Sequence, residues 1–371
     1  MKTKLMLVLP SMAGGGAEKV ALLLLSSFDK EKYDIFLVLF KKEGEYLAQV
    51  PEHINIISLH KKTKFDVFAL IWRLRNTFKR IKPDAILSFL TYTNAVSIIS
   101  AFLSGYLEKI IISQRNYHKL EEDSKIKKFI YPFLYRMAKK IIVISKGLKD
   151  SLVTDWKVSA DRICVIYNPV DLAKVILLKE ENIEHPCFNK IQEGRIIINI
   201  GRLEKQKNQE LLLMAFKNVL EKADAFLIIL GKGSLRERLE KKAEELGIES
   251  RVYFVGFQNN PFTWLRRSDI FVLSSDFEGF GNVIIEAMAC GVPVVSTDCP
   301  YGPGEIITHL ENGLLVKPRD YEGLAEAITF VLSNPEVASR LRSNALQTVK
   351  QYDINRIGMQ YEEVLKEVMF K

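Results

Sequence analysis

The sequence is poor in cysteine and lacks long apolar runs, internal repeats and low-complexity tracts. Its four cysteines are too few and too widely spaced for a disulfide scaffold or a paired-cysteine metal site, which favours a reducing compartment. They are Cys164, Cys187, Cys290 and Cys299. The longest mostly apolar stretch, residues 95–107, is shorter than the ~20 residues that span a bilayer. The apolar run at the amino terminus ends at Pro10, too early for a signal peptide. We therefore expect no membrane span, and no solenoid.

Composition and charge indicate a globular chain made of two parts. Apolar residues make up 48% and charged residues 26%, and a length of 371 residues predicts about two domains. The net charge of +8 is unevenly spread. Residues 1–170 carry 28 basic and 16 acidic side chains, whereas residues 171–371 carry 25 and 29. Halves with net charges of +12 and −4 suggest domains that face different partners.

Short runs rich in leucine or β-branched residues alternate with amphipathic stretches, which predicts parallel strands joined by helices. Strands are expected at residues 4–9, 33–40, 54–59, 85–89, 109–113, 140–144, 162–166, 195–200, 225–230, 252–255, 270–273, 293–296 and 313–316. We predict an α/β fold with two doubly wound, Rossmann-like domains at residues 1–170 and 195–352, joined by a polar linker at 171–194. Ligands bind at the carboxyl ends of such strands, so the chemistry should lie on the loops that follow them.

A glycine loop follows the first predicted strand and precedes a helix. Gly14, Gly15 and Gly16 allow a ligand close to the backbone, and the start of a helix favours an anion. The loop matches neither the GxGxxG pattern of dinucleotide folds nor the P-loop pattern. A phosphate site and a simple flexible turn both remain open.

A second loop of this kind follows strand 195–200. Gly201 opens it, and Arg202 and Lys207 supply two cations where a diphosphate leaving group would be held. A solvated basic loop is the alternative.

The most specific segment lies between residues 275 and 295. A glycine-rich turn that contains Glu278 leads into a short apolar helix that contains Glu286, and Gly291 is expected to end that helix. A glutamate among small apolar residues is costly to bury unless hydrogen-bond donors meet it, and sugar or ribose hydroxyls are such donors. The alternative is that Glu286 lies on a solvated helix face.

These residues resemble the retaining glycosyltransferases of family 4, which have the two-domain GT-B fold. The resemblance covers nearly the whole chain and is carried by EGFGNVIIEAMACGVPVV, GRLEKQKN, AGGGAEK, VISKGLKDSL, VIYNPVD and DCPYGPGEII. It implies two Rossmann-like domains facing a central cleft, with a final helix at 353–371 that crosses back to the first domain.

The resemblance also implies roles for single residues. Arg202 and Lys207 would contact the donor diphosphate, Glu278 the hydroxyls of the donor sugar, and Glu286 the ribose hydroxyls. The implied donor-binding residues are Gly14, Gly15, Gly16, Gly201, Phe257, Phe280, Gly281, Asn282, Glu286 and Glu305. Among them, Phe257 would border the base and Glu305 the sugar pocket, and backbone N–H groups at 280–282 would point to sugar or phosphate.

One position departs from the family pattern. Many members carry a histidine after the strand that corresponds to residues 109–113, and here Arg115 stands in that place. An arginine stays charged and cannot act as a base, but it can bind a phosphate or carboxylate or orient a hydroxyl. His118 could substitute if the loop bends, and a surface histidine is the alternative.

The departure fits a front-face mechanism, in which the leaving diphosphate oxygen takes the acceptor proton. Arg202, Lys207 and the helix N-termini would stabilise the charge on that leaving group without a metal. The sequence has no DxD-type pair in a suitable loop, so we predict no metal and no other cofactor.

The basic half has two segments in which cations and aromatic residues are interleaved. Residues 61–82 hold eight basic residues and one acid, and residues 125–140 repeat the mixture. Basic amphipathic helices with aromatic residues commonly lie on anionic membranes. The alternative is that their apolar residues simply face the core. Nucleic acid is disfavoured, because no nucleic-acid module is visible and the motifs serve a nucleotide-sugar site.

Together these features predict a cytoplasmic, peripheral membrane enzyme that transfers a sugar, most simply from a UDP-sugar, to a membrane-associated glycan such as a polyprenyl-diphosphate oligosaccharide, lipopolysaccharide or capsule precursor. Two alternatives stay open. One is a nucleotide-sugar epimerase of related architecture, and the other is a non-catalytic protein that binds anionic lipid or nucleic acid.

Overall fold

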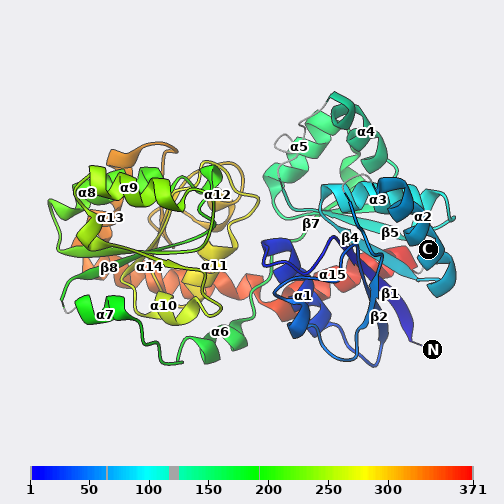
Figure 1. The fold of residues 1–371 in the computed structure, drawn as a ribbon, viewed down its shortest axis with the longest axis horizontal. Helices are drawn as coiled ribbons and strands as arrows, with labels where there is room; N and C mark the ends of the chain where they lie inside the picture. Colours follow the sequence, from blue (N-terminus) through cyan, green and yellow to red (C-terminus); the bar gives the residue numbers. More distant parts are fainter. Residues whose placement is uncertain (1, 64–65, 117–124, 192, 370–371) are drawn as a thin grey trace. The chain divides into compact units, whose positions relative to one another are not determined.

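The computed structural model describes residues 2–63, 66–116, 125–191 and 193–369. The chain forms two compact units (Figure 1). Unit 1 consists of Met1–Pro169 together with Ile354–Lys371, and unit 2 consists of Val170–Asp353. No helix among the described residues has both the length and the apolar character needed to cross a bilayer. His118, the predicted substitute for the family histidine, lies outside the described residues.

Unit 1 is built on a parallel sheet with the order β3-β2-β1-β4-β5-β6-β7. Its strands are β1 (Thr3–Leu9), β2 (Tyr33–Leu39), β3 (Asn55–Ser58), β4 (Ala85–Phe89), β5 (Ile110–Gln114), β6 (Lys140–Val143) and β7 (Ile163–Val165). Strands β1 and β4 are neighbours although β2 and β3 lie between them in the chain. The strand order therefore reverses there, which is the place where doubly wound sheets bind ligands.

Helices cover both faces of this sheet (Figure 1). They are α1 (Gly16–Ser27), α2 (Val67–Ile81), α3 (Thr91–Phe102), α4 (Lys125–Tyr135), α5 (Lys146–Trp156) and α15 (Ile354–Met369), with 3₁₀ turns η1 (Leu47–Gln49), η2 (Leu107–Lys109) and η4 (Ala160–Arg162). Helix α1 packs against α15, and α3 packs against both α2 and α4. Apolar residues of α15 lie in the same buried core as those of β1, β2 and α1.

Unit 2 repeats the plan with the order β10-β9-β8-β11-β12-β13, again all parallel. Its strands are β8 (Arg195–Ile200), β9 (Ala225–Leu230), β10 (Val252–Gly256), β11 (Ile270–Leu273), β12 (Val294–Thr297) and β13 (Leu314–Val316). Here the order reverses between β8 and β11. All thirteen predicted strands are present, each within one residue of its expected ends, and the predicted α/β class with two doubly wound sheets is confirmed.

The helices of unit 2 include the segment that the sequence predicts as a linker. They are α6 (Leu172–Leu178), α7 (Pro186–Lys190), α8 (Gln209–Leu220), α9 (Arg236–Glu245), α10 (Phe262–Arg266), α11 (Asn282–Ala289), α12 (Pro303–Ile306), α13 (Tyr321–Ser333) and α14 (Pro335–Thr348), with 3₁₀ turns η5 (Lys205–Lys207), η6 (Glu249–Arg251) and η7 (Val349–Tyr352). The predicted linker at 171–194 thus contains α6 and α7, and both belong to unit 2.

Local capping explains these two short helices. The Asp171 carboxylate accepts a hydrogen bond from the Lys174 N–H at 2.9 Å, and Pro186 stands at the first position of α7. Val175 and Cys187 are buried, and α6 packs on α10 and α11. Single buried residues in helices of one to two turns leave no readable period, so the sequence pattern indicates a loop instead.

Candidate active site

The most specific predicted residues of unit 2 meet where the strand order reverses. The loop after β8 carries Gly201, Arg202 and Lys207, and the loop after β11 carries Glu278. Because β8 and β11 are adjacent parallel strands, both loops leave the same edge of the sheet. Lys207 and Glu278 are 71 positions apart in the sequence, and the sheet order brings them together.

Lys207 and Glu278 form an ion pair that is almost closed to solvent. The Lys207 Nζ lies 2.5 Å from Glu278 Oε1, and the two side chains are 14% and 7% exposed. The Ser275 hydroxyl donates to the same Oε1 at 2.7 Å. The methylene carbons of Lys207 run past Gly201, where a Cβ would lie 3.4 Å from three of them. The ammonium therefore has a fixed position at the end of β8.

Hydrogen bonds between the two loops hold this pair in register. The Asp276 N–H donates to Gln206 O at 2.9 Å, and the Gln206 amide donates to Phe277 O at 2.9 Å. The Ser274 hydroxyl donates to Lys207 O at 2.9 Å, and Asn208 links its amide to Asp276 at 3.0 Å. The loops thus form one layer rather than two independent strips of backbone.

A third loop, between β12 and α12, completes the edge. The Glu278 N–H donates to Pro300 O at 2.7 Å, and the Tyr301 N–H donates back to Glu278 O at 2.9 Å. A Cβ at Gly302 would collide with the backbone carbonyl of Phe280. This contact requires glycine at 302, and it fixes the backbone of the glycine-rich turn.

The turn ends in α11, whose first residues were predicted to present N–H groups to a ligand. Gly281 caps the helix with φ +98° and Asn282 begins it, so the left-handed conformation favours glycine at 281. Glu286 lies within α11 and is 7% exposed, which contradicts the alternative of a solvated helix face. At the other end, Gly291 has φ +76°, as expected for a residue that ends a helix.

The remaining predicted residues of unit 2 lie around this layer. Arg202 is exposed, and its guanidinium has no hydrogen-bond or ion-pair partner among the described residues. Phe257 follows Gly256 and is 37% exposed, with Lys232 Nζ 5.5 Å above its ring. Glu305 is half-buried in the first turn of α12. An exposed cation on the same loop as a buried cation–carboxylate pair suits an anionic ligand that carries hydroxyl groups.

The electrostatic surroundings of the pair also affect Cys299. Burial raises the pKa of the Cys299 thiol to about 12, and the nearby Glu278 carboxylate adds to the rise. Burial likewise raises the pKa of Cys290 to about 12, with a contribution from Glu286. Thiols with such pKa values stay protonated at neutral pH and are poor nucleophiles.

The glycine loop of unit 1 has two carboxylates beside it, which a phosphate site would not be expected to have. Gly14, Gly15 and Gly16 lie between β1 and α1, as expected. A side chain at Gly14 would collide with the Glu45 carboxylate, and one at Gly15 with the Glu18 carboxylate. Carboxylates repel phosphate and accept hydrogen bonds from hydroxyls, so a diphosphate at this loop requires these two side chains to move.

A buried polar network lies at the ends of the adjacent strands β4 and β5, and no sequence motif predicted it. Asn94 donates to Ser113 O and to the Tyr135 hydroxyl, both at 3.0 Å. Thr91 donates to Gln114 Oε1 at 3.1 Å, and the Tyr135 hydroxyl also contacts that oxygen. Scattered single Thr, Asn and Gln residues in apolar segments were the available signal.

Arg115 is directed into unit 1. Its guanidinium donates to Ser113 Oγ at 3.0 Å, to the Tyr361 hydroxyl at 3.3 Å and to Asn168 Oδ1, and it lies over the Phe89 ring. Only 4% of the residue is exposed. Arg115 thus ties β5 to α15 and to the segment before unit 2, and its contact with a donor stays a prediction.

Two residues that support the site were also missed. Ser275 holds the Glu278 carboxylate, and Gln209 donates its amide to Arg202 O at 3.0 Å while 1% exposed. Both lie close to motif residues: Ser275 is three residues before the EGFGN segment, and Gln209 directly follows GRLEKQKN. A search for polar residues flanking the motifs would have found them.

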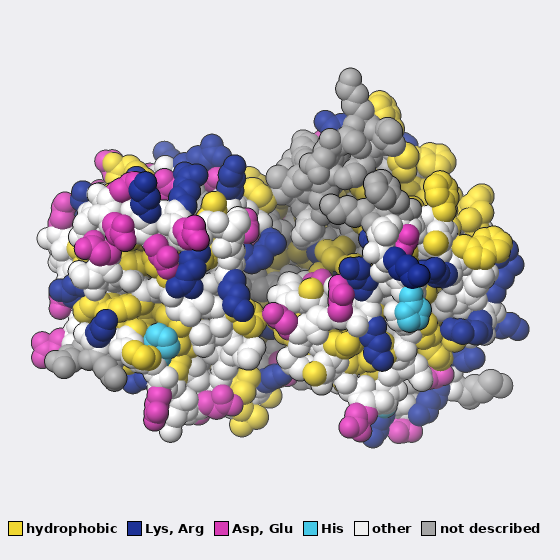
Figure 2. All heavy atoms as spheres, in the orientation of Figure 1, with side chains coloured by type: hydrophobic (Ala, Val, Ile, Leu, Met, Phe, Trp, Pro, Cys, Tyr) yellow, Lys and Arg dark blue, Asp and Glu magenta, His cyan; other side chains and the backbone are white. Residues whose placement is uncertain are grey.

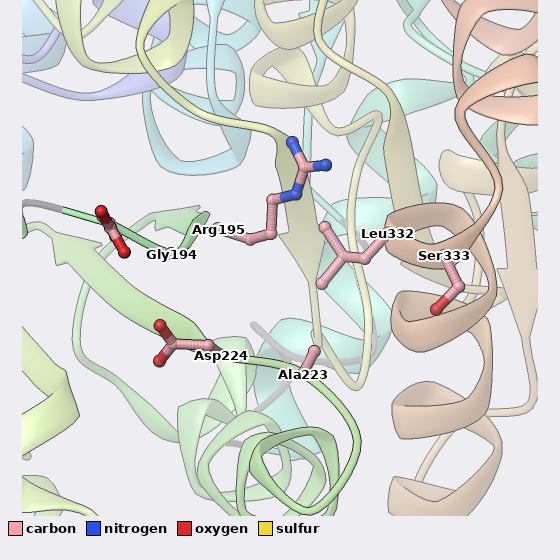
Figure 3. Close-up of a pocket in the computed structure, with 7 residues that line it drawn as sticks. Gly194, Arg195, Ala223, Asp224, Leu332 and Ser333 are labelled. Carbon is pink, nitrogen blue, oxygen red and sulfur yellow. The ribbon is translucent and has the colours of Figure 1, made fainter.

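A hollow of about 460 Å³ lies elsewhere in unit 2 (Figure 3). Its lining comes from the start of β8, the turn before β9 and the end of α13. These are the amino ends of the strands, opposite to the edge that carries Lys207 and Glu278. In parallel sheets the ligand edge is the carboxyl one, so we do not assign the site to this hollow.

Two family models match the chain. The family model described as Glycosyl transferases group 1 matches residues 181–348, and the model described as Glycosyltransferase Family 4 matches residues 14–174. The first match includes every predicted site residue of unit 2, and the second includes the glycine loop and Arg115.

Two full-length relatives carry glycosyltransferase names. The chain is 29% identical over 368 residues to the N-acetylgalactosamine-N,N'-diacetylbacillosaminyl-diphospho-undecaprenol 4-alpha-N-acetylgalactosaminyltransferase of Campylobacter jejuni, covering 96% of this chain and 97% of that protein. It is 30% identical over 358 residues to an uncharacterized glycosyltransferase of Methanocaldococcus jannaschii, covering 84% and 88%.

Solved structures show the same fold. A structure of Anabaena HepE in complex with UDP-glucose has a TM-score of 0.83 at 21% identity and covers 98% of this chain and 99% of that one. A glycosyltransferase from Rickettsia africae has a TM-score of 0.83 at 20% identity and covers 99% of both chains. The two parallel-sheet units are therefore those of a GT-B fold, and the chain belongs to the glycosyltransferases of group 1 and family 4.

Proposed function

We propose that this glycosyltransferase moves a sugar from a UDP-sugar to a membrane-associated glycan acceptor, with retention at the anomeric carbon. The observation that carries the proposal is the buried Lys207–Glu278 pair, with the exposed Arg202 on the same loop as Lys207, at the carboxyl edge where parallel sheets bind ligands. The structures of HepE in complex with UDP and with UDP-glucose support the choice of donor. Relatives named for undecaprenol-linked substrates support a polyprenyl-diphosphate acceptor.

In this proposal Lys207 and Arg202 stabilise the charge that develops on the leaving diphosphate. An ammonium has three N–H donors, so Lys207 can keep Glu278 and also donate to a phosphate oxygen. Glu278 then offers its second carboxylate oxygen to the sugar hydroxyls, and Glu286 accepts from the ribose. The departing phosphate oxygen takes the acceptor proton on the same face, which leads to retention.

We further propose that transfer requires no metal, because two cations already face the leaving group. The expected result is full activity after dialysis against EDTA and no gain on adding Mg²⁺ or Mn²⁺. Loss of activity in EDTA that a divalent ion restores would contradict this part alone.

Substitution of Lys207 tests the site. Lys207→Ala should lower transfer roughly 100-fold or more, because one preorganised charge is removed from the transition state. Lys205 lies on the same 3₁₀ turn and is exposed, so Lys205→Ala is the matched control and should keep near wild-type activity. Far-ultraviolet circular dichroism checks that both variants fold. Near wild-type turnover in Lys207→Ala would refute its role.

A thermal-shift series tests the donor. A ligand that binds the folded state raises the melting temperature, and saturation at 100 times Kd adds about 2.7 kcal/mol. UDP-sugars should give the largest shift among UDP-, GDP- and ADP-sugars at equal concentration. A larger shift with GDP- or ADP-sugars would replace the donor, and no shift with any of them would overturn the donor site.

The two alternatives are separated by leaving out the acceptor. Without an acceptor, an epimerase still converts a UDP-sugar to its epimer, whereas a transferase only slowly hydrolyses the UDP-sugar to UDP and free sugar. A non-catalytic binding protein would show neither reaction and no response to UDP.

We place the reaction on the cytoplasmic face of a membrane, with the basic first half as the peripheral contact.

A further inference from the structure

Large apolar side chains that face solvent are concentrated on one part of unit 1. Seven of them lie on α2, α4 and the end of α3, and we call this set the apolar face. Its members and their exposed fractions are Phe68 (87%), Trp72 (59%), Phe102 (60%), Leu103 (48%), Phe129 (80%), Ile130 (45%) and Phe133 (60%). Figure 2 shows hydrophobic side chains gathered along this side of unit 1, where Figure 1 places α4, α3 and α2. Contiguous exposed apolar surface of this kind marks an interaction site.

Helix α2 presents these residues on a stripe separate from its core side. Phe68, Trp72, Arg75 and Lys79 are spaced i, i+4, i+7 and i+11, so they lie on one face of the helix. Residues 70, 71, 74, 77 and 78 form the buried face instead. The core of unit 1 is therefore complete without Phe68 and Trp72, and packing does not explain them.

Helix α4 repeats the arrangement. Phe129 and Phe133 are spaced i and i+4, and Arg136 follows directly after the helix at i+7. Ile130 and Lys128 are also exposed on this segment. Two helices with the same order of two aromatic residues and one arginine suggest that both contact the same partner.

Helix α3 joins the two stripes. It packs against α2 on one side and α4 on the other, and its end supplies Phe102 and Leu103. The Arg75 guanidinium lies 4.6 Å above the Trp72 ring and donates to Leu103 O at 3.1 Å. The seven side chains thus belong to one packed layer of helices.

The two segments that carry most of the apolar face contain cations and no acid. Residues 67–82 contain five cations and residues 125–140 contain six, of which Lys139 and Lys140 pair with Glu108 and Glu367 of other elements. Arginine and lysine next to exposed aromatic residues match the lipid–water interface of an anionic bilayer, where rings reach the acyl boundary and cations reach phosphates. Single-stranded nucleic acid also binds rings and cations, but Leu103 and Ile130 offer no surface for base stacking.

We propose that the apolar face of α2, α3 and α4 inserts into the interface of an anionic membrane, with Arg75, Lys79, Lys128 and Arg136 held at the lipid phosphates. This deepens the proposed function, since it gives the membrane contact of an enzyme whose acceptor is lipid-linked. The contact itself stands on the exposed residues and not on the identity of the donor.

Trp72 is a natural reporter for the test. The other two tryptophans, Trp156 and Trp264, are 3% and 2% exposed and give a constant background. On mixing with vesicles of phosphatidylcholine and phosphatidylglycerol at 7:3, the emission of the full-length protein should shift to shorter wavelength. Trp72→Phe should abolish the shift. An unchanged spectrum in wild-type protein would overturn the insertion of Trp72.

Flotation with the same vesicles measures binding. The triple variant Phe68→Ser, Phe129→Ser, Phe133→Ser should reduce the bound fraction at least tenfold, and pure phosphatidylcholine vesicles should bind wild type at least tenfold less. Leu177→Ser in unit 2, at a residue 73% exposed, is the matched control and should bind like wild type. Equal binding by the triple variant, or capture by single-stranded RNA in preference to vesicles, would overturn the proposal.

The melting-temperature shift with UDP separates this proposal from the proposed function. The triple variant should respond to UDP like wild type, since none of its changes lies in unit 2. A protein that binds vesicles but ignores every nucleotide sugar would leave the membrane face intact and overturn only the donor.

Discussion

The contact between Lys207 and Glu278 is held by the protein's own groups, with the Ser275 hydroxyl on the same carboxylate oxygen. Both side chains are largely buried, so each charge depends on the other to remain tolerable in that place. In the proposed function, donor binding changes the partner of the ammonium from a carboxylate alone to a carboxylate and a phosphate. The site would then be preorganised, because the protein itself fixes the position of the cation.

Replacement of Glu278 by glutamine separates these roles. Glu278→Gln leaves a buried ammonium without its counter-charge, which should lower the free energy of unfolding by about 3 kcal/mol. UDP alone should then raise the melting temperature more in this variant than in wild type, because its phosphates restore a partner to Lys207. Differential scanning fluorimetry checks both effects.

Glu204 supplies the control for that experiment. It lies in the loop after β8, where its carboxylate accepts from the Ser234 hydroxyl at 3.0 Å near the surface. Glu204→Gln should therefore change stability and the UDP response only slightly. Equal UDP shifts in all three proteins would mean that Lys207 does not contact the phosphates.

The buried thiols of Cys290 and Cys299 give the protein a sensitivity to high pH. Burial raises the pKa of each from 9.0 to about 12, so an unfolded chain loses these protons from pH 9 upward while the folded chain keeps them. The free energy of unfolding should consequently fall between pH 9 and 12, by up to about 1.4 kcal/mol per pH unit for each thiol.

Urea unfolding of the double variant Cys290→Ala, Cys299→Ala checks this slope. The variant should lose less stability than wild type between pH 9 and 10.5, whereas the two proteins should have parallel pH dependence below pH 8. Parallel curves at high pH as well would show that these thiols do not account for the alkaline loss.

At the scale of elements, α15 is held by a contact between residues that lie far apart in the chain. Arg115 donates to Asn168 and Tyr361, which are 53 and 246 residues away. The first of these lies just before the chain enters unit 2, and the second lies on α15 after it returns. One side chain thus anchors both ends of the excursion through unit 2.

Arg115→Lys tests that anchor. A lysine keeps the charge but lacks the planar fork that reaches several partners at once, so unit 1 should lose about 1–3 kcal/mol. Tyr361→Phe removes one hydroxyl only and should lose less. Hydrogen exchange should show faster exchange along α15 in Arg115→Lys, and the UDP-induced melting shift should persist. Unchanged protection of α15 would contradict the anchoring role.

Whether a feature could be predicted from the sequence depends on how far apart in the chain its interacting residues lie. Strand positions and the Glu278–Glu286 motif were predictable, because alternating apolar runs and fixed local spacings are properties of neighbouring residues. The pairing of Lys207 with Glu278 needed the order of β8 and β11, which parallel topology supplies but no local pattern does. The partners of Arg115 and the Glu45 carboxylate beside Gly14 were out of reach for the same reason, whereas Glu18 lies only three residues after Gly15 and was within reach of a local pattern.

The helices that carry the apolar face show a similar limit. Their amphipathic pattern predicted one apolar side and one basic side, and residues 70, 71, 74, 77 and 78 of α2 do face the core. The pattern did not reveal that Phe68 and Trp72 lie on the basic side, nor that the end of α3 adds Phe102 and Leu103. The exposure of a side chain depends on how neighbouring elements pack against it, and the pattern along one helix does not show this.

At the scale of the whole molecule, the two units have separate cores and opposite charge. The buried cluster of unit 2 contains only residues of that unit, from Ile197 to Leu341. A fragment of residues 170–353 should therefore fold cooperatively alone and respond to UDP. Circular dichroism melting with and without UDP checks this, and a fragment without a cooperative transition would show that unit 2 requires unit 1.

Unit 1 cannot complete its core until the end of the chain has been synthesised, because α15 supplies part of that core. Ile357, Tyr361 and Leu365 are buried against β1, α1 and their neighbours, yet they follow the 184 residues of Val170–Asp353. At 5–20 residues per second a ribosome needs about 10–40 s to add that segment. The first unit to emerge is thus the last to be completed, and during translation the surface that awaits α15 is open to chaperones.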